Sequence, residues 1–194
     1  MQALRLPYGD GYQTASIDDS LKIQMIDPPI RPVTKSLEEL LEYAMEHPYG
    51  TPLLENLAKP DDTVVIVMND HTRPGPNPLI LSAIMKRLEK AGIPDENITI
   101  LFATGSHRAP TREEAVRIMG EEYYHRLKSI AHDCRDDAAM VNIGNTSEGV
   151  PVYVNRLVTE CSLLITTGLV APIHTAGYSG GRKSILPGVA GLKT

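Results

Sequence analysis

Five consecutive apolar residues, Val64–Met68, limit the folds open to this chain more than any other feature. A strand with one face in water alternates apolar and polar residues, whereas an uninterrupted run is typical of a parallel strand covered on both faces. Similar buried strands are predicted at Ile98–Ala103 and Ser162–Thr167, with an amphipathic helix at Pro78–Ala91. Strands that alternate with helices in this way predict a single α/β domain, Rossmann-like, with a mostly parallel sheet flanked by helices.

Weaker signals complete the predicted order of elements. The alternation over Leu21–Ile26 predicts an early strand. Ser36 and Glu39 have the spacing of a capping box, which begins a predicted helix that ends near Glu46. The other predicted elements are helices at Pro52–Leu57 and at Thr111–Leu127, the second broken at Gly120, and a short strand at Val152–Val154.

Composition excludes several classes of function. The 194 residues carry 19 Lys and Arg against 24 Asp and Glu, a formal net charge of −5, so no nucleic-acid partner is expected. No run approaches the roughly 18 apolar residues of a membrane span, and Met1–Asp10 has no apolar run typical of a signal peptide, so no membrane partner is expected. Cys134 and Cys161 form no CxxC pair, which predicts a reduced cytoplasmic protein with both thiols buried.

Polar residues gather directly after each of the three best strands. Asn69–Pro74 follows the first and Thr104–Arg108 follows the second, while Gly168 leads from the third towards His174 and Gly177–Ser184. Ligands of open α/β sheets bind beyond the carboxyl ends of the strands. Parallel strands would bring all three clusters to one edge, so the sequence predicts a binding site there.

The first two clusters offer groups for binding and proton transfer. Arg73 can clamp a carboxylate or a phosphate, and Asp70 can orient an imidazole or hold a hydroxyl group. His107 supplies an imidazole, a group that suits proton transfer near neutral pH. Structural roles are the alternative, because Asp70 can cap a helix or pair with Arg73 at the surface, and His107 can simply be solvated.

The third cluster offers the strongest signal for an anion. Glycines within Gly177–Gly181 permit positive φ, so successive N–H groups can face a phosphate. Lys183 adds charge and can act as a covalent anchor, since a desolvated amine is a nucleophile. Arg182 occupies the second glycine position of the P-loop pattern and Pro187 follows too soon for a long helix, which argues against an ATPase loop. A glycine-rich surface turn with two solvated cations is the alternative.

Three segments resemble the N-terminal domain of the nickel-dependent lactate racemase family. They are Asp70-His71-Thr72-Arg73-Pro74, Thr104-Gly105-Ser106-His107-Arg108 and the run Ala176–Gly188. The resemblance implies a racemase or epimerase of a small-molecule 2-hydroxy acid such as lactate. It also implies a nickel-pincer nucleotide (nickel pyridinium-3,5-bisthiocarboxylic acid mononucleotide) made by cofactor-synthesis proteins. That cofactor takes a hydride from the substrate carbon, leaving a 2-keto acid, and returns it to either face.

The resemblance further implies roles for particular residues. Lys183 matches the lysine that carries the cofactor covalently, Arg73 matches the substrate-binding arginine, and His107 matches one of two histidines that exchange the hydroxyl proton. The positions that match the surroundings of the cofactor and its phosphate are Asp70, Thr72, Ser179, Gly180 and Gly181.

The sequence departs from the family pattern in two places, and each affects the predicted active site. The second catalytic histidine of the family directly follows a proline, whereas here Ile173 follows Pro172 and His174 comes one place later. Either His174 acts from a shifted loop, or the protein acts on another substrate with an altered acid–base group. The family's nickel-ligating histidine lies beyond the lysine motif, so no metal ligand is expected within this chain.

Residues 1–194 are therefore expected to be the N-terminal cofactor-binding domain of a longer racemase-like protein, without its C-terminal domain and inactive alone. Two other functions fit the same residues. One is a non-catalytic module that binds a nucleotide or phosphate through the glycine loop. The other is a metal-free epimerase that uses His107 and His174 as paired bases. The substrate side chain and the oligomeric state stay open.

Overall fold

The computed structural model describes residues 1–26, 32–174 and 176–194, which fall into two compact units, residues 1–34 and 35–194. The first unit contains an antiparallel hairpin of β1 (Gln2–Tyr8) and β2 (Gly11–Ile17), joined by the two-residue turn Gly9–Asp10. Gly9 has φ +57°, which suits glycine in a tight hairpin turn.

The strand predicted at Leu21–Ile26 is wrong, because these residues form neither strand nor helix. Alternation alone does not make a strand; its backbone groups need a neighbouring strand, and this segment pairs with none of the described residues. The hairpin does have a signal in the sequence, a Gly-Asp pair between two short runs of residues, which lies outside the alternating segment.

The second unit is built on a four-stranded parallel sheet. Its strands are β3 (Val64–Asn69), β4 (Ile98–Ala103), β5 (Lys128–Ala131) and β8 (Leu163–Thr166), in the order β5-β4-β3-β8. The predicted α/β class, with a parallel sheet flanked by helices in one domain, is confirmed.

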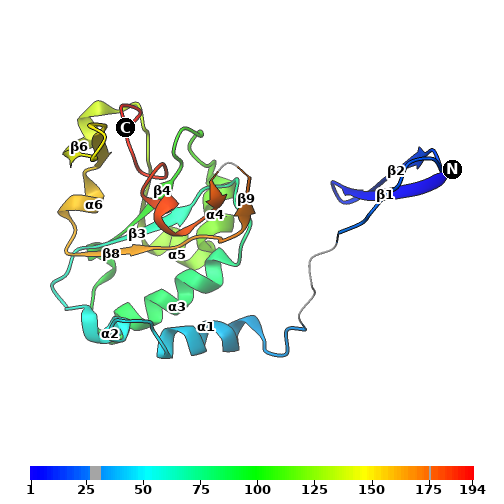
Figure 1. The fold of residues 1–194 in the computed structure, drawn as a ribbon. Helices are drawn as coiled ribbons and strands as arrows, with labels where there is room; N and C mark the ends of the chain where they lie inside the picture. Colours follow the sequence, from blue (N-terminus) through cyan, green and yellow to red (C-terminus); the bar gives the residue numbers. More distant parts are fainter. Residues whose placement is uncertain (27–31, 175) are drawn as a thin grey trace. The chain divides into compact units, whose positions relative to one another are not determined.

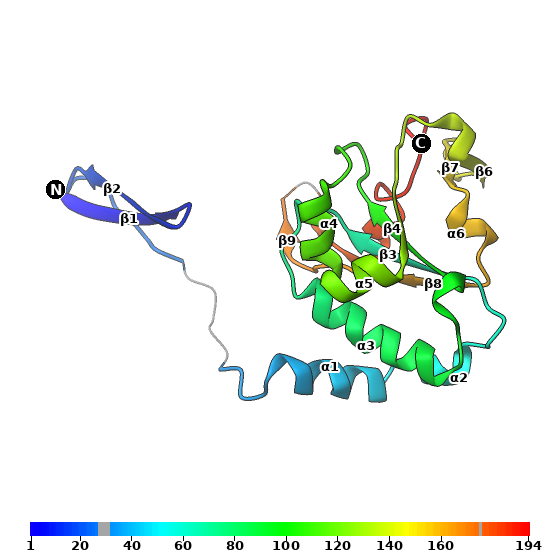
Figure 2. The same cartoon turned by 180° about the vertical axis from the view of Figure 1, so that it is seen from behind.

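Helices and short hairpins surround this sheet (Figures 1 and 2). The helices are α1 (Leu37–Glu46), α2 (Leu54–Leu57), α3 (Asn77–Lys90), α4 (Arg112–Met119), α5 (Glu121–Arg126) and α6 (Leu157–Glu160). Single 3-10 turns occupy Asp95–Asn97, Asp137–Ala139 and Gly181–Ser184. The small antiparallel pairs are β6 (Met140–Asn145) with β7 (Pro151–Asn155), and β9 (Pro172–Ile173) with β10 (Gly177–Tyr178). Gly120, at φ +82°, separates α4 from α5 as predicted.

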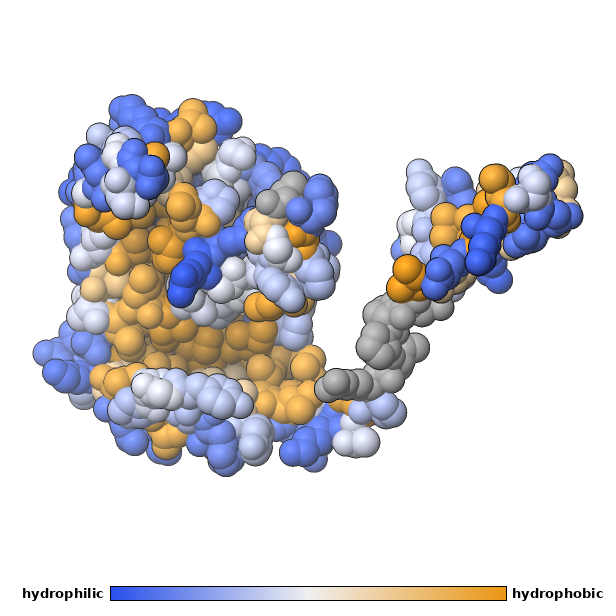
Figure 3. Space-filling view, viewed as in Figure 1, coloured by the Kyte–Doolittle hydropathy of each residue, from blue (hydrophilic) through white to orange (hydrophobic). Residues whose placement is uncertain are grey.

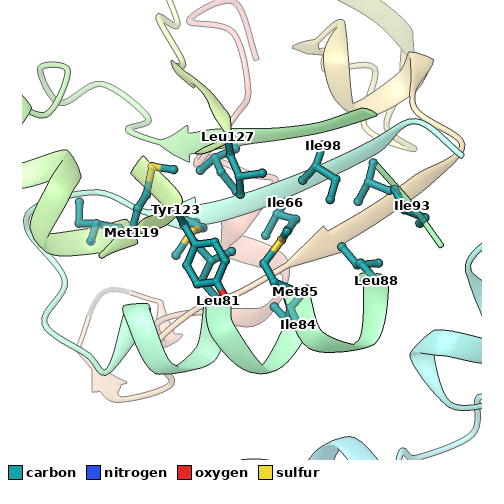
Figure 4. Packing of buried hydrophobic residues seen from close by; sticks show 14 of the residues in the cluster. Ile66, Leu81, Ile84, Met85, Leu88, Ile93, Ile98, Met119, Tyr123 and Leu127 are labelled. Carbon is teal, nitrogen blue, oxygen red and sulfur yellow. The ribbon is translucent and has the colours of Figure 1, made fainter. Parts of the chain in front are cut away.

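The two faces of the sheet bury different sets of side chains. On one face, Ile66 and Ile98 pack against Leu81, Met85 and other residues of α3, with α4 and α5 beside it (Figure 4). On the other face, Val67 belongs to a smaller cluster that includes residues of α6 and of the segment after Lys183. Because side chains alternate across a strand, the unbroken apolar run of β3 serves both clusters.

The third predicted strand differs from expectation, because β8 is an edge strand rather than a fully buried one. Only β3 pairs with it among the described strands, and its burial alternates, with Leu164 38% exposed. Figure 3 shows hydrophobic side chains gathered on the side of the molecule where β8 lies. A short apolar run in the sequence does not distinguish the edge of a parallel sheet from its centre.

The remaining sequence expectations concern membranes and thiols. No helix among the described residues is long and apolar enough to cross a bilayer. Both cysteines are free; Cys134 is buried, whereas Cys161 is only partly buried, which corrects the prediction for that thiol. Burial raises the pKa of the Cys161 thiol.

Capping boxes begin two of the helices. The predicted one is confirmed at α1, where the Ser36 hydroxyl accepts from Glu39 N–H at 3.1 Å and the Glu39 carboxylate accepts from Ser36 N–H at 2.7 Å. A second, formed by Thr111 and Glu114, begins α4, which contributes buried residues to the main core.

Replacing Thr111 with alanine should lower the free energy of unfolding by about 1 kcal/mol, because the hydroxyl that caps α4 is lost. Thr111→Ser keeps the hydroxyl and should stay close to the wild-type value. Urea unfolding measures both. Equal loss in the two variants would contradict a capping role for Thr111.

Candidate functional site

The carboxyl ends of β3, β4 and β8 lie together at one edge of the parallel sheet, as the sequence predicts. A cavity of about 160 Å³ opens there, and residues from all three polar clusters line it. The lining residues are Asn69, Asp70, Thr72, Arg73, Ala103, Thr104, Gly105, Ser106, His107, Leu169, Ser179, Gly180, Lys183, Ser184, Pro187 and Gly188.

A carboxylate–imidazole pair joins the first two clusters. His107 Nδ1 lies 2.6 Å from Asp70 Oδ2, and the Asp70 side chain is 3% exposed whereas that of His107 is 46% exposed. Asp70 Oδ1 accepts from the hydroxyl of Thr72 at 2.6 Å and from its N–H at 3.0 Å. Asp70 therefore holds one nitrogen of His107 and leaves the ring accessible from the cavity, the arrangement that orients a general base.

The pKa of Asp70 reflects competing effects. Burial alone raises it, but hydrogen bonds from Thr72 and His107 outweigh burial, so the pKa lies below its ordinary value. The carboxylate is thus ionised at neutral pH and available to stabilise a charge on His107.

The glycine-rich loop after β8 is fixed by its backbone and by one serine. The Ser179 hydroxyl donates to Leu169 O at 2.6 Å and accepts from Ala171 N–H at 3.0 Å. Gly180 has φ +66°, and a Cβ there would lie 2.7 Å from Leu169 O, so only glycine allows this close approach. The hydroxyl of Ser179 positions the loop, while the backbone at Gly180 and the Lys183 side chain border the cavity.

The segment that follows Lys183 is held from three sides. Gly105 N–H donates to Gly188 O at 2.9 Å, and the Ser184 hydroxyl donates to Thr167 O at 3.1 Å. His132, 2% exposed, places Nε2 2.9 Å from Ala190 O. These bonds tie the lysine loop to the ends of the neighbouring strands.

Buried His132 has a defined protonation state. Nε2 donates to Ala190 O, so Nδ1 is free to accept from Asn155 Nδ2 at 3.2 Å. Burial lowers the pKa of His132 and outweighs the hydrogen bond to Ala190, so the ring is neutral. His132 therefore supports the site from behind the cavity instead of contacting a ligand.

Most of the predicted site residues line the cavity. They are Asp70, Thr72, Arg73, His107, Ser179, Gly180 and Lys183. His174 and Gly181 are exposed and are not among the lining residues. Ser184 and Gly188 also line the cavity but are not among the predicted site residues. Ser184 stands beside the lysine in the glycine-rich run, which is a local signal, whereas the role of Gly188 depends on the fold.

Candidate metal ligands do not cluster in the described part of the chain. Across residues 1–26, 32–174 and 176–194, no group of three His, Cys, Asp or Glu side chains is placed to hold a metal ion. Lys183 and Arg73 offer positive charge, and the loop offers glycine backbone, to an anionic ligand such as a nucleotide phosphate.

Comparison with known proteins identifies the family. The model of the lactate racemase N-terminal domain matches residues 8–194. The chain belongs to this family. Its relatives include the lactate racemases of Lactiplantibacillus plantarum, 38% identical over 196 residues, and of Thermoanaerobacterium thermosaccharolyticum, 36% identical over 200 residues. Each alignment covers 100% of this chain and 46% of the relative, so the chain spans about half the length of these lactate racemases.

Solved structures agree with this family. The lactate racemase apoprotein from T. thermosaccharolyticum matches with a TM-score of 0.85 and 34% identity, over 98% of this chain and 44% of that one. A protein from Thermotoga maritima matches with a TM-score of 0.68 and 26% identity, over 80% of this chain and 39% of that one. The lactate racemase N-terminal fold therefore describes nearly the whole chain.

Proposed function

We propose that this chain is the N-terminal, cofactor-binding part of a racemase or epimerase of a 2-hydroxy acid, lactate or a relative. The observation that carries the proposal is one cavity bordered by Lys183, Arg73 and the Asp70–His107 pair. Membership of the lactate racemase N-terminal domain family supports it.

Each of these side chains has a role in that reaction. Arg73 binds the substrate carboxylate, because guanidinium and carboxylate match as a two-bond fork. His107 accepts and returns the hydroxyl proton at its Nε2, while Asp70 holds Nδ1 and stabilises the ring when it is charged.

The residues fit the nucleotide part of a nickel-pincer cofactor. Lys183 would provide the amine for its covalent attachment, and the backbone at Gly180 together with Arg73, which border the same cavity, would face its phosphate. When bound, this cofactor supplies reversible hydride transfer at the substrate carbon. The proposed partners are the small 2-hydroxy acid and the proteins that make the cofactor.

His174 and Gly181 have smaller roles in this proposal than the residues that line the cavity. Both are exposed and outside the cavity lining of this chain. His174 follows β9 in a turn, so it contributes the second acid–base group only from a loop that closes towards the cavity.

Mass spectrometry of the full-length protein, produced with the cofactor-making proteins, tests the proposal. We expect added mass on the peptide that contains Lys183, none on the peptide that contains exposed Lys193, and racemisation of enantiopure lactate or another 2-hydroxy acid. An unmodified Lys183 together with no racemisation of any 2-hydroxy acid would contradict the proposal. Racemisation that survives both Lys183→Ala and nickel chelation would indicate a metal-free epimerase instead.

A further inference from the structure

A second cavity, of about 360 Å³, lies beside the candidate site. It is bordered by the loop after β3, the beginning of α3 and the last turn of α4, which contribute His71, Arg73, Asn77 and Arg117. Asp70 and Arg73 line both cavities, so the two are adjacent.

Two side chains that line this second cavity, those of Asn77 and His71, have polar groups without hydrogen-bond partners in the described ranges; of these groups, Nδ1 of His71 is fully buried. Asn77 is 6% exposed, yet its side chain forms no hydrogen bond with any described residue. Nδ1 of His71 is buried and also has no partner in the described part of the chain. Buried polar groups are nearly always hydrogen-bonded, because burying them unpaired costs free energy. Their presence indicates a cavity shaped for a polar ligand.

The charge around the cavity favours an anion. Arg73 and Arg117 form no ion pair with any residue in the described ranges. Among the described residues, Asp70 is the acidic side chain that lines the cavity, and Thr72 and His107 already engage both of its oxygens.

Glu114 is a second acidic group close enough to interact with His71. Two hydrogen bonds from Arg108, at 2.6 and 2.7 Å, lower the pKa of Glu114 to about 2 and neutralise its charge locally. The Arg117 guanidinium and the free amide of Asn77 therefore border this cavity, with Arg73 at its junction with the candidate site, a set of donors that matches an oxyanion.

We propose that this cavity binds a second carboxylate of the substrate, so that the preferred substrates are 2-hydroxy dicarboxylic acids. The inference rests on the proposed function, in which Arg73 binds the carboxylate next to the hydroxyl group. Because Arg73 borders both cavities, a substrate held there extends its far end towards Arg117 and Asn77. A carboxylate satisfies these donors, whereas an uncharged side chain leaves them unpaired.

Titration of the 194-residue chain, followed by NMR chemical shifts, tests the substrate class without cofactor or turnover. The probes are malate, 2-hydroxybutyrate and inorganic phosphate. The first two have four carbons, and only malate has a second carboxylate. We expect the Kd of malate to be at least about tenfold lower than that of 2-hydroxybutyrate. Equal affinities would overturn the proposal, as would phosphate binding that depends on Arg117 without any preference for malate.

Two variants locate the effect, with a third as control. Arg117→Gln should raise the Kd of malate about tenfold and leave that of 2-hydroxybutyrate unchanged. Asn77→Asp, close in shape but acidic, should have the same effect by repulsion. Arg112→Gln removes an exposed cation from the other end of the same helix and should change neither Kd. No effect of Arg117→Gln, or an equal effect of Arg112→Gln, would overturn the proposal.

The two proposals fail separately. Loss of racemisation by the complete enzyme with malate preference intact would count against the proposed function alone. Racemisation of lactate by the complete enzyme, with no preference for malate in this titration, would overturn only the proposal that the second cavity binds a second carboxylate.

Discussion

Gly188→Ala should lower the free energy of unfolding by about 3 kcal/mol, near the upper end of the usual range for overpacking a buried position. A Cβ at this buried residue would lie 2.3 Å from Ser184 O and 2.8 Å from Lys183 O. Both contacts are backbone atoms, so no side chain can turn away to make room. The chain at Lys183 and Ser184 must move, and the hydrogen bond from Gly105 N–H to Gly188 O weakens with it.

Guanidinium-induced unfolding of this variant and of Gly181→Ala provides the measurement and its control. Gly181 has φ +56°, but a Cβ at this position would meet no atom of the described residues within 4 Å. Its replacement should therefore cost only about 1–2 kcal/mol of backbone strain. A Gly188→Ala variant no less stable than Gly181→Ala would contradict the steric argument.

Asp70→Asn should lower kcat of the complete, cofactor-loaded enzyme about 100-fold, with a smaller change in KM. The two oxygens of the carboxylate serve different partners, Thr72 and His107. An amide has one oxygen and no charge, so the variant cannot serve both partners or stabilise a protonated His107. Asp61→Asn, an exposed carboxylate before the same strand, should leave kcat unchanged. Equal kcat for wild type and Asp70→Asn would rule out a role for the pair.

Asp70→Asn should also change how the free energy of unfolding depends on pH. The pKa of Asp70 is lower in the folded chain than its ordinary value near 4, so the ionised carboxylate stabilises the fold above that pH. This contribution is lost as the pH falls through the folded-state pKa. Wild type should therefore exceed Asp70→Asn by about 2 kcal/mol at pH 7, and the difference should shrink below about pH 4. A constant difference between pH 7 and pH 3 would show that the charge of Asp70 does not matter.

Hydrophobic patterning and turn chemistry were sufficient to predict the centre of this fold. The unbroken run at Val64–Met68 is a central parallel strand, and three polar clusters do meet at one sheet edge. These features depend on residues close together in the chain and on the general rule for parallel sheets.

Features that depend on distant partners were not predictable in this way. The edge position of β8 follows from which strands pair, and the role of Gly188 follows from a backbone contact with Lys183 and Ser184. In the sequence, His132 simply follows a short strand, and its contact with Ala190 is visible only in the folded structure. Asn77 and Arg117 belong to different helices, so their shared cavity has no local signal.

The hydrogen bonds on both sides of Gly188 have a consequence for how the site responds to a ligand. Thr167, Gly105 and His132 each hold the stretch from Ser184 to Ala190, and each comes from the end of a different parallel strand. The backbone that follows Lys183 is thus anchored to the ends of the sheet strands, and Lys183 is held through it. A ligand attached to the amine of Lys183 is therefore held through three strand ends at once.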